Sequence, residues 1–287
     1  MDANSMKTAA VLGSGTMGHG IAQVLAQSGI TTRMFDVAQG ALDKGLASVR
    51  SNLDKGVEKQ KLDAATRDAA LARLSITTDF AAAIRGVDVV IEAVPERIEL
   101  KTKLFGELGR ALGPDVLLAT NTSSLPITRI GAAAEHPERV VGMHFFNPVH
   151  LMKLIEVVRA EQSSEAAVHA AIELGRRMGK DPIDVRDAPG FASSRLGICI
   201  GLEAMRMLES GVASAEDIDK AMVLGYGFPM GPLQLTDLVG LDVRLGIAEH
   251  LARELGPRFE PPRLLREMVA AGKLGKKSGQ GFYPWPR

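Results

Sequence analysis

The chain has 287 residues, 46% of them apolar and 24% charged, which is the composition of an ordinary soluble globular protein. Its 34 Lys and Arg residues balance its 34 Asp and Glu residues, which argues against a general nucleic-acid or membrane-surface binder. A single cysteine, Cys199, excludes an intrachain disulfide and fits a reducing compartment. The sequence shows neither a bilayer-spanning apolar run nor the Cys and His spacing of a metal site. We therefore expect a soluble, cytoplasmic protein without a metal.

Strand-like and helix-like segments alternate through the first two thirds of the chain. Residues 39–73 are charged and helical in pattern, with Gly56 as the expected break, and predict a helical hairpin near 40–73. Alternation of this kind predicts an α/β domain with a mainly parallel, Rossmann-type sheet covered by helices. The predicted strands are residues 8–13, 31–36, 87–95, 115–124, 140–146, 154–158 and 182–186, and the other predicted helices are residues 17–27, 98–112 and 165–178.

The character of the sequence changes at DAPG, residues 187–190. Beyond this point the apolar residues recur with helical period between Gly and Pro residues, and no clear strand appears. Helices are predicted over residues 194–211 and 214–225, with Ser214 as the N-cap of the second. We therefore expect a boundary near Ala188, between an α/β domain of residues 1–188 and an all-α domain of residues 189–287.

The turn between the first strand and the first helix carries Gly13, Gly15 and Gly18 in the spacing G-x-G-x-x-G. The first glycine allows a tight turn, the second allows close approach of the backbone to a pyrophosphate, and the third allows close packing of helix on sheet. The helix N-terminus adds N–H groups and a positive dipole end for the phosphates. These glycines, with Thr16 and Met17 of the same turn, are candidate cofactor contacts.

Asp36 ends the second predicted strand, where the dinucleotide fingerprint requires an acidic residue. Its carboxylate would accept hydrogen bonds from the adenosine ribose hydroxyls and repel a 2′-phosphate, and neither Val37 nor Ala38 offers a cation to such a phosphate. NAD is therefore favoured over NADP as the cofactor. A glycine-rich turn with a capping Asp and no ligand is the alternative, and the coincidence of strand, helix and acid disfavours it.

His144 and Glu156 interrupt two apolar, strand-like runs, where a buried charge or imidazole is costly unless it is paired. If the two strands are neighbours, one ring nitrogen of His144 donates to Glu156 and the other serves as a base. A dehydrogenase needs such a base, because a proton leaves the hydroxyl group as hydride leaves the carbon. A satisfied core histidine beside an unrelated surface Glu is the alternative, and spacing alone leaves both interpretations open.

Other polar residues follow the predicted strands. The segment NTSS, residues 121–124, holds a substrate oxygen or caps the next helix, and the sequence favours neither. Asn147 is a ligand contact or a turn residue before Pro148. Glu96 and Lys101 follow the third predicted strand, where a helix-start charge and a solvated lysine are the commoner case.

Together these residues resemble the L-3-hydroxyacyl-CoA dehydrogenase family, in its short stand-alone form, often called 3-hydroxybutyryl-CoA dehydrogenase. The resemblance runs from about Ala9 to Tyr283. It implies an NAD-binding domain followed by an all-α domain that closes the active site and forms a homodimer. The matching strings are GSGTMGHGIAQV, VIEAVPE, NTSSLPI, GMHFFNPVHLMKLIEVV, DAPGF, ASAEDIDKAM, PMGPLQLTDLVGLD and GKLGKKSGQGFY.

The resemblance also implies roles for individual residues. His144 would be the catalytic base, Glu156 its orienting partner, and Ser123 a hydrogen-bond donor to the substrate oxygen that also touches the cofactor. The hairpin near 40–73 would grip coenzyme A through Asn52 and Lys59, although the family's residue at the first position is often a serine. Further cofactor contacts would come from Glu96, Lys101, Asn121, Asn147 and Lys277.

One position departs from the family pattern. After PGF the family has an Asn followed by Arg, and that Asn contributes to the active site, whereas this chain has Ser194 before Arg195. Serine offers one hydroxyl where an amide offers both a donor and an acceptor. The expected activity is reversible, NAD-dependent oxidation of an L-3-hydroxyacyl-CoA to the 3-ketoacyl-CoA.

Two alternatives accompany this expectation. Ser194 leaves open a related dehydrogenase of a free hydroxy acid, such as L-gulonate or carnitine, against which the predicted coenzyme A hairpin argues. A non-catalytic NAD-binding protein on the same scaffold is the second alternative, and the retained His144, Glu156 and Ser123 argue against it.

Overall fold

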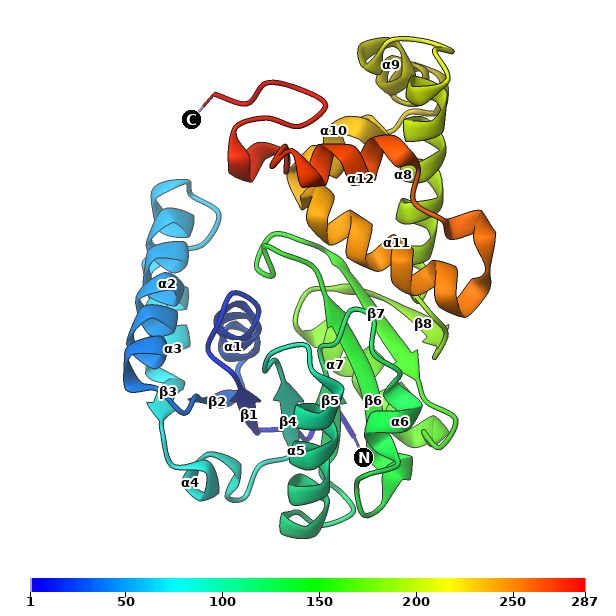
Figure 1. The fold of residues 1–287 in the computed structure, drawn as a ribbon. Helices are drawn as coiled ribbons and strands as arrows, with labels where there is room; N and C mark the ends of the chain where they lie inside the picture. The colour runs from blue at the N-terminus through cyan, green and yellow to red at the C-terminus, as the bar shows by residue number, and fades with distance from the viewer. Residues whose placement is uncertain (1, 287) are drawn as a thin grey trace. The chain divides into compact units, whose positions relative to one another are not determined.

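The computed structural model describes residues 2–286, which divide into two compact units, residues 2–187 and residues 188–286. The first unit is built on one sheet of eight strands, and the second is helical (Figure 1). Each unit contains a hydrophobic core of its own. Within residues 2–286, none of the helices combines the length and the apolar character needed to cross a bilayer.

The sheet has the strand order β3-β2-β1-β4-β5-β6-β7-β8. Strands β1 to β6 are parallel to one another, in the order of the doubly wound dinucleotide-binding fold. Strand β7 runs antiparallel to β6, and β8 is parallel to β7, so the mainly parallel sheet is confirmed. The strands are β1 Thr8–Leu12, β2 Thr31–Phe35, β3 Leu74–Thr77, β4 Val89–Glu92, β5 Leu117–Thr120, β6 Val140–Phe145, β7 Leu154–Arg159 and β8 Asp181–Arg186.

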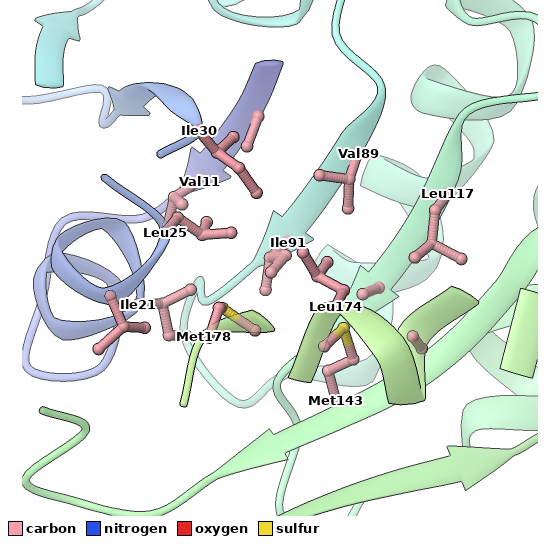
Figure 2. Close-up of a cluster of buried hydrophobic side chains, with 14 of the residues drawn as sticks. Val11, Ile21, Leu25, Ile30, Val89, Ile91, Leu117, Met143, Leu174 and Met178 are labelled. Carbon is pink, nitrogen blue, oxygen red and sulfur yellow. The ribbon is translucent and has the colours of Figure 1, made fainter. Parts of the chain in front are cut away.

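Helices α1 and α7 cover one face of the sheet. Ile21 and Leu25 of α1 and Leu174 of α7 pack with alternate strand residues such as Val11 and Ile91 in one buried cluster (Figure 2). Burial of each of these aliphatic side chains contributes about 1.5–3 kcal/mol. The helices of the first unit are α1 Gly18–Gln27, α2 Gln39–Glu58, α3 Ala64–Ala72, α4 Phe80–Ile84, α5 Ile98–Ala111, α6 Ile127–Gly131, the 3₁₀ turn η1 Pro137–Arg139, and α7 Glu165–Arg177.

The opposite face of the sheet is where polar side chains are buried. Side chains alternate between the two faces along a strand. On the α1 face lie Ile91, Ala119, Met143 and Ile155, so the next residue of each strand lies on the other face. These next residues are Glu92, Thr120, His144 and Glu156, each of them buried. The sheet thus gathers four polar groups on one face near the carboxyl ends of β4, β5 and β6.

The helical hairpin predicted near 40–73 is present as α2 and α3, but the break predicted at Gly56 is wrong. Helix α2 continues through Gly56 to Glu58, and the chain turns at Gln60, whose φ is 54°. A Cβ at Gly56 would lie 2.5 Å from the side chain of Leu62. This glycine therefore lets the turn fold back onto the helix, and Asp63 then caps α3 through Thr66 N.

Three short elements lie outside the sequence prediction. Strand β3 pairs only with β2 at the edge of the sheet, and the helices α4 and α6 have five residues each. Four or five residues give too few repeats for a period of 2 or 3.6 to emerge. As a result, the segment predicted as the third strand is β4.

The second unit consists of helices around one apolar cluster, apart from isolated bridges near Gln280. Ser214 caps α9 by accepting from Asp217 N, as predicted. Two buried carboxylates tie the C-terminal segment to the helices: Asp237 accepts from Phe282 N, Tyr283 N and Trp285 Nε1, and Asp219 accepts from Tyr283 Oη. The helices are α8 Ser193–Glu209, α9 Ala215–Tyr226, α10 Pro232–Val239, α11 Leu241–Leu255 and α12 Arg263–Ala270, with 3₁₀ turns η2 Pro257–Phe259 and η3 Lys276–Ser278.

Replacing Arg139 with Met should destabilise the protein by about 2–4 kcal/mol in urea unfolding. Arg139 is fully buried, and its terminal nitrogens donate to the carbonyl oxygens of Gly109, Leu112, Gly113, Val116 and Glu135. The variant would leave carbonyl groups at the end of α5 without this donor. The control is Arg110→Met, which changes an exposed arginine of α5. An equal loss of unfolding free energy in both variants would contradict the stabilising role of Arg139.

Candidate active site

The glycine-rich turn after β1 has the geometry that a pyrophosphate requires. Gly13 has a φ of 103°, and a Cβ there would lie 2.5 Å from Ala93 O. A Cβ at Gly18 would lie 1.8 Å from Gly13 O, whereas a Cβ at Gly15 would point into open space. Helix α1 begins at Gly18 without a side-chain cap. The first and third glycines therefore fold the turn, and the second leaves room for a ligand beside the helix N-terminus.

Asp36 lies directly after β2, beside this turn. Its Oδ2 accepts hydrogen bonds from Ser14 N and Ser14 Oγ, both at 2.9 Å, and its Oδ1 accepts from Ala38 N at 3.3 Å. These bonds hold the carboxylate at the carboxyl end of β2, where the fold binds the ribose of a dinucleotide. The glycine turn and Asp36 thus fit NAD, which would supply the hydride acceptor when bound.

His144 and Glu156 form a buried pair. The register aligns His144 of β6 with Glu156 of β7, and His144 Nδ1 lies 2.7 Å from Glu156 Oε2. Glu156 is 0% exposed and His144 is 7% exposed. The expectation that the two residues meet on neighbouring strands is confirmed, and the surface position considered for Glu156 is wrong. The ring of Phe146 lies beside the imidazole, at 4.6 Å between centroids.

A second buried charge pair joins β4 to α5. Lys101 Nζ lies 2.6 Å from Glu92 Oε1 and 3.3 Å from Glu96 Oε2. Glu92 also accepts hydrogen bonds from Thr120 Oγ1 and from Val94 N. Burial raises the pKa of Glu92, and the Lys101 ammonium and these donors oppose that rise. Because Lys101 is only 1% exposed, its interpretation as a solvated lysine is wrong.

Glu96 connects this pair to the segment NTSS. Glu96 Oε1 accepts from Thr122 Oγ1 at 2.5 Å and from Ser123 N at 2.9 Å. Thr122 Oγ1 also accepts from Leu125 N, but helix α6 begins after Pro126 without a side-chain cap, so the alternative that this segment caps the next helix is wrong. The segment therefore forms a turn whose shape Glu96 fixes, and this turn carries the hydroxyl of Ser123.

Asn121 joins β5 to β6 near the base. Its Oδ1 accepts from Phe145 N at 2.9 Å, and its own N–H donates to Glu92 O. The residue next to His144 is thus tied to the carboxyl end of β5. The structure gathers Asn121, Ser123, Glu96 and Lys101 with the polar groups of one sheet face.

Of the remaining predicted residues, three belong to the first unit and two to the second. Asn52 donates to Gln23 Oε1 at 3.2 Å and so joins α2 to α1, while Lys59 is exposed at the end of α2. Asn147 is exposed in the loop after β6. In the second unit, Ser194 lies in the first turn of α8, and Lys277 forms an ion pair with Asp242.

Sequence reasoning missed Glu92 and Thr122. Glu92 interrupts the apolar run of β4 in the same way as Glu156 interrupts β7, so a charge inside a strand-like run was the available signal. Thr122 carries no comparable signal, because its role depends on Glu96, which comes from another strand-to-helix connection. Within residues 2–286, no group of three His, Cys, Asp or Glu side chains is arranged to hold a metal ion.

A doubly wound sheet, a dinucleotide turn with Asp36 and a buried imidazole–carboxylate pair together define an NAD-dependent oxidoreductase. Residues 8–188 match the family model of the 3-hydroxyacyl-CoA dehydrogenase NAD binding domain, and residues 190–285 match that of the 3-hydroxyacyl-CoA dehydrogenase C-terminal domain. The chain belongs to the 3-hydroxyacyl-CoA dehydrogenase family.

Individual relatives are similar over nearly the whole chain. The probable 3-hydroxybutyryl-CoA dehydrogenase of Deinococcus radiodurans is 44% identical over 96% of this chain and 99% of its own. The 3-hydroxyadipyl-CoA dehydrogenase of Escherichia coli is 43% identical over 98% of this chain and 59% of its own. The crystal structure of (S)-3-hydroxybutyryl-CoA dehydrogenase from Ralstonia eutropha has a TM-score of 0.95 and 42% identity, over 99% of this chain and 100% of that one.

Replacing Lys101 with Met should cost about 3–5 kcal/mol of unfolding free energy, because the buried Glu92 would lose the cation that offsets the cost of its burial. The double variant Glu92→Gln with Lys101→Met should lose less, because Gln can still pair with Thr120 and Val94 N. The exposed Lys103→Met on the same helix should change stability by less than about 0.5 kcal/mol. Urea unfolding measures all three variants, and equal losses for Lys101→Met and Lys103→Met would refute the charge pair.

Proposed function

We propose that this enzyme catalyses the reversible, NAD-dependent oxidation of a short L-3-hydroxyacyl-CoA, of the 3-hydroxybutyryl-CoA type, to the 3-ketoacyl-CoA. The observation that carries the proposal is the buried contact between His144 Nδ1 and Glu156 Oε2 at 2.7 Å. A hydroxyl group that loses hydride from its carbon must also lose its proton, and an imidazole held by a carboxylate is suited to take it.

In this mechanism Glu156 fixes the tautomer of His144. Glu156 accepts from Nδ1–H, so the lone pair of the neutral ring lies on Nε2, which is the nitrogen that takes the hydroxyl proton. The fully buried carboxylate then stabilises the imidazolium that forms. NAD supplies the hydride acceptor when bound. In the reverse direction Nε2 returns the proton to the oxygen of the ketone.

Ser123 and the network behind it position the substrate oxygen. Glu96 accepts from Ser123 N and from Thr122 Oγ1, and Lys101 in turn holds Glu96. We assign to the Ser123 hydroxyl a hydrogen bond to the substrate oxygen and a contact with the cofactor. Glu96, Lys101, Asn121 and Asn147 then shape the nicotinamide side of the site, as part of the same proposal.

The hairpin of α2 and α3 is the proposed site for coenzyme A. Lys59 is an exposed cation at the end of α2, where it can meet a phosphate, and Asn52, seven residues earlier, donates to Gln23 Oε1. In the second unit, Ser194 and Lys277 are retained as proposed substrate and cofactor residues respectively. The ion pair of Lys277 with Asp242 fixes the position of its ammonium group within that unit.

The variant His144→Ala should lose roughly 10²–10⁴ in kcat, the usual contribution of a general base, while NAD binding is kept. Turnover is followed as NADH absorbance with acetoacetyl-CoA, and NAD binding by calorimetry. Glu156→Gln, which keeps a hydrogen-bonding group without its charge, should lose less. Turnover of His144→Ala at the wild-type rate would exclude this mechanism, and free acetoacetate reduced as well as its CoA ester would exclude the CoA-ester substrate.

We also propose that the enzyme is a cytoplasmic homodimer that associates through helices of its second unit. Exposed large apolar side chains are concentrated there, and they include Leu224 at 80%, Tyr226 at 78% and Leu196 at 64% exposure. Exposed apolar surface of this kind marks interfaces. The single Cys199 fits the reducing cytoplasm.

In solution the wild type should therefore have twice the chain mass by light scattering. The double variant Leu224→Glu with Tyr226→Glu should have the mass of one chain, because the charges would be buried in the interface. Leu151→Glu changes an exposed apolar residue of the first unit and should leave the dimer intact. A monomeric wild type, or a dimer that survives the double variant, would argue against this interface.

A further inference from the structure

Arg244 is a buried cation whose guanidinium has no hydrogen-bond or ion-pair partner among residues 2–286. It lies in the first turn of α11, is 7% exposed, and its Nε has no hydrogen-bond acceptor. Within residues 2–286 no ion pair reaches its guanidinium, and burial alone, without a neighbouring carboxylate, lowers its pKa. A guanidinium stays charged in a protein, so this burial is costly unless an anion joins it.

The contrast with Arg139 shows that burial of arginine in this chain has two different causes. Both Nε atoms lack an acceptor, but the terminal nitrogens of Arg139 donate to five carbonyl oxygens and so close the end of α5. Arg139 is therefore structural. Arg244 has no comparable set of carbonyl acceptors within the described part of the chain.

Three carboxylates of the second unit, Asp219, Asp237 and Asp242, are engaged with donors other than Arg244. Asp219 accepts from Leu233 N and Gln234 N, and Asp237 accepts from the C-terminal segment. Asp242, two residues before Arg244, pairs with Lys277. None of these three carboxylates therefore neutralises the buried guanidinium of Arg244 on α11.

The guanidinium lies against α8, close to Ser194. A Cβ on Gly197 would be 3.2 Å from Arg244 Nη1, so the absence of a side chain at Gly197 makes room for the guanidinium. Gly197 is three residues after Ser194, and positions three apart share one face of a helix. Gly197, which the guanidinium contacts, is thus about one turn, or roughly 4.5 Å of helix rise, from Ser194, the residue proposed to meet the substrate.

We propose that Arg244 binds a carboxylate at the far end of the acyl chain, so that the preferred substrate is an L-3-hydroxyacyl-CoA with a terminal carboxylate. This inference rests on the proposed function and narrows its substrate class. The planar fork of a guanidinium matches a carboxylate with two parallel hydrogen bonds. A short acyl chain whose reacting end is at Ser194 needs only a few carbon–carbon bonds to bring its other end to Arg244.

The test compares two substrates of equal length, 3-oxohexanoyl-CoA and 3-oxoadipyl-CoA, in reduction by NADH. The measured quantity is the ratio of kcat/KM for the carboxylated substrate to that for the neutral one. A charge-assisted hydrogen bond predicts a ratio of roughly 10 to 100 in the wild type. A wild-type ratio of one or less would overturn the proposal, whatever the variants do.

Variants of Arg244 then assign the preference to this side chain. Arg244→Met should bring the ratio close to one, mainly by raising KM for 3-oxoadipyl-CoA, and Arg244→Lys, which keeps one charge but not the fork, should give an intermediate ratio. Arg253→Met changes an exposed arginine of the same helix and should keep the wild-type ratio. A wild-type ratio in folded Arg244→Met would overturn the proposal. If that variant does not fold, Arg244→Lys decides in the same way.

Two further outcomes separate this inference from the function on which it rests. Turnover of neither CoA ester would contradict the proposed function itself, whereas turnover of both at equal efficiency would contradict only the role of Arg244. Free 3-hydroxyadipate with NAD is the third arm. Its oxidation as efficiently as that of the CoA ester would place the recognised carboxylate on a free acid and overturn the proposed substrate class.

Discussion

The pairing of β6 with β7 is the constraint on which the proposed chemistry depends. Antiparallel register puts His144 directly opposite Glu156, and the pleat turns both side chains to the same face of the sheet. There the two groups satisfy each other at 2.7 Å in a site that would otherwise penalise both. A shift of the register by one residue would move one of them to the α1 face and separate base from carboxylate.

The neighbouring strands extend the same principle. Glu92 and Thr120 lie opposite each other on β4 and β5, and Lys101 reaches down from α5 to neutralise the carboxylate. Glu96, which pairs with Lys101, also accepts a hydrogen bond from Ser123 N and so holds the turn that carries Ser123. One sheet face therefore holds two buried polar pairs, the hydrogen-bonded His144 and Glu156 and the ion pair of Glu92 with Lys101. In the proposed mechanism the His144–Glu156 pair provides the base, and the Glu92–Lys101 pair holds the loop that carries Ser123.

The buried charged residues of this protein differ in whether they have partners within the protein. The terminal nitrogens of Arg139, the ammonium of Lys101 and the carboxylate of Asp237 all end on protein partners, so their burial is explained by the fold. Arg244 is the exception that led to the proposed specificity. Its guanidinium lies against Gly197 of α8, which is one helical turn from Ser194, the position where the chain departs from the family pattern.

The sequence by itself determined the α/β alternation and the glycine turn with Asp36, because each depends on a period or spacing within a short segment. Spacing alone left the meeting of His144 with Glu156 open, and the pairing of β6 with β7 decided it. Only the tertiary structure decided the path of α2 through Gly56, the edge strand β3, and the pairing of Glu92 with Lys101. It also decided that the terminal nitrogens of Arg139 have carbonyl acceptors and that Arg244 lacks such a set, a difference that the sequence does not reveal. The physical reason is that burial and the partners of a buried charge come from segments far apart in the chain, and no local pattern records them.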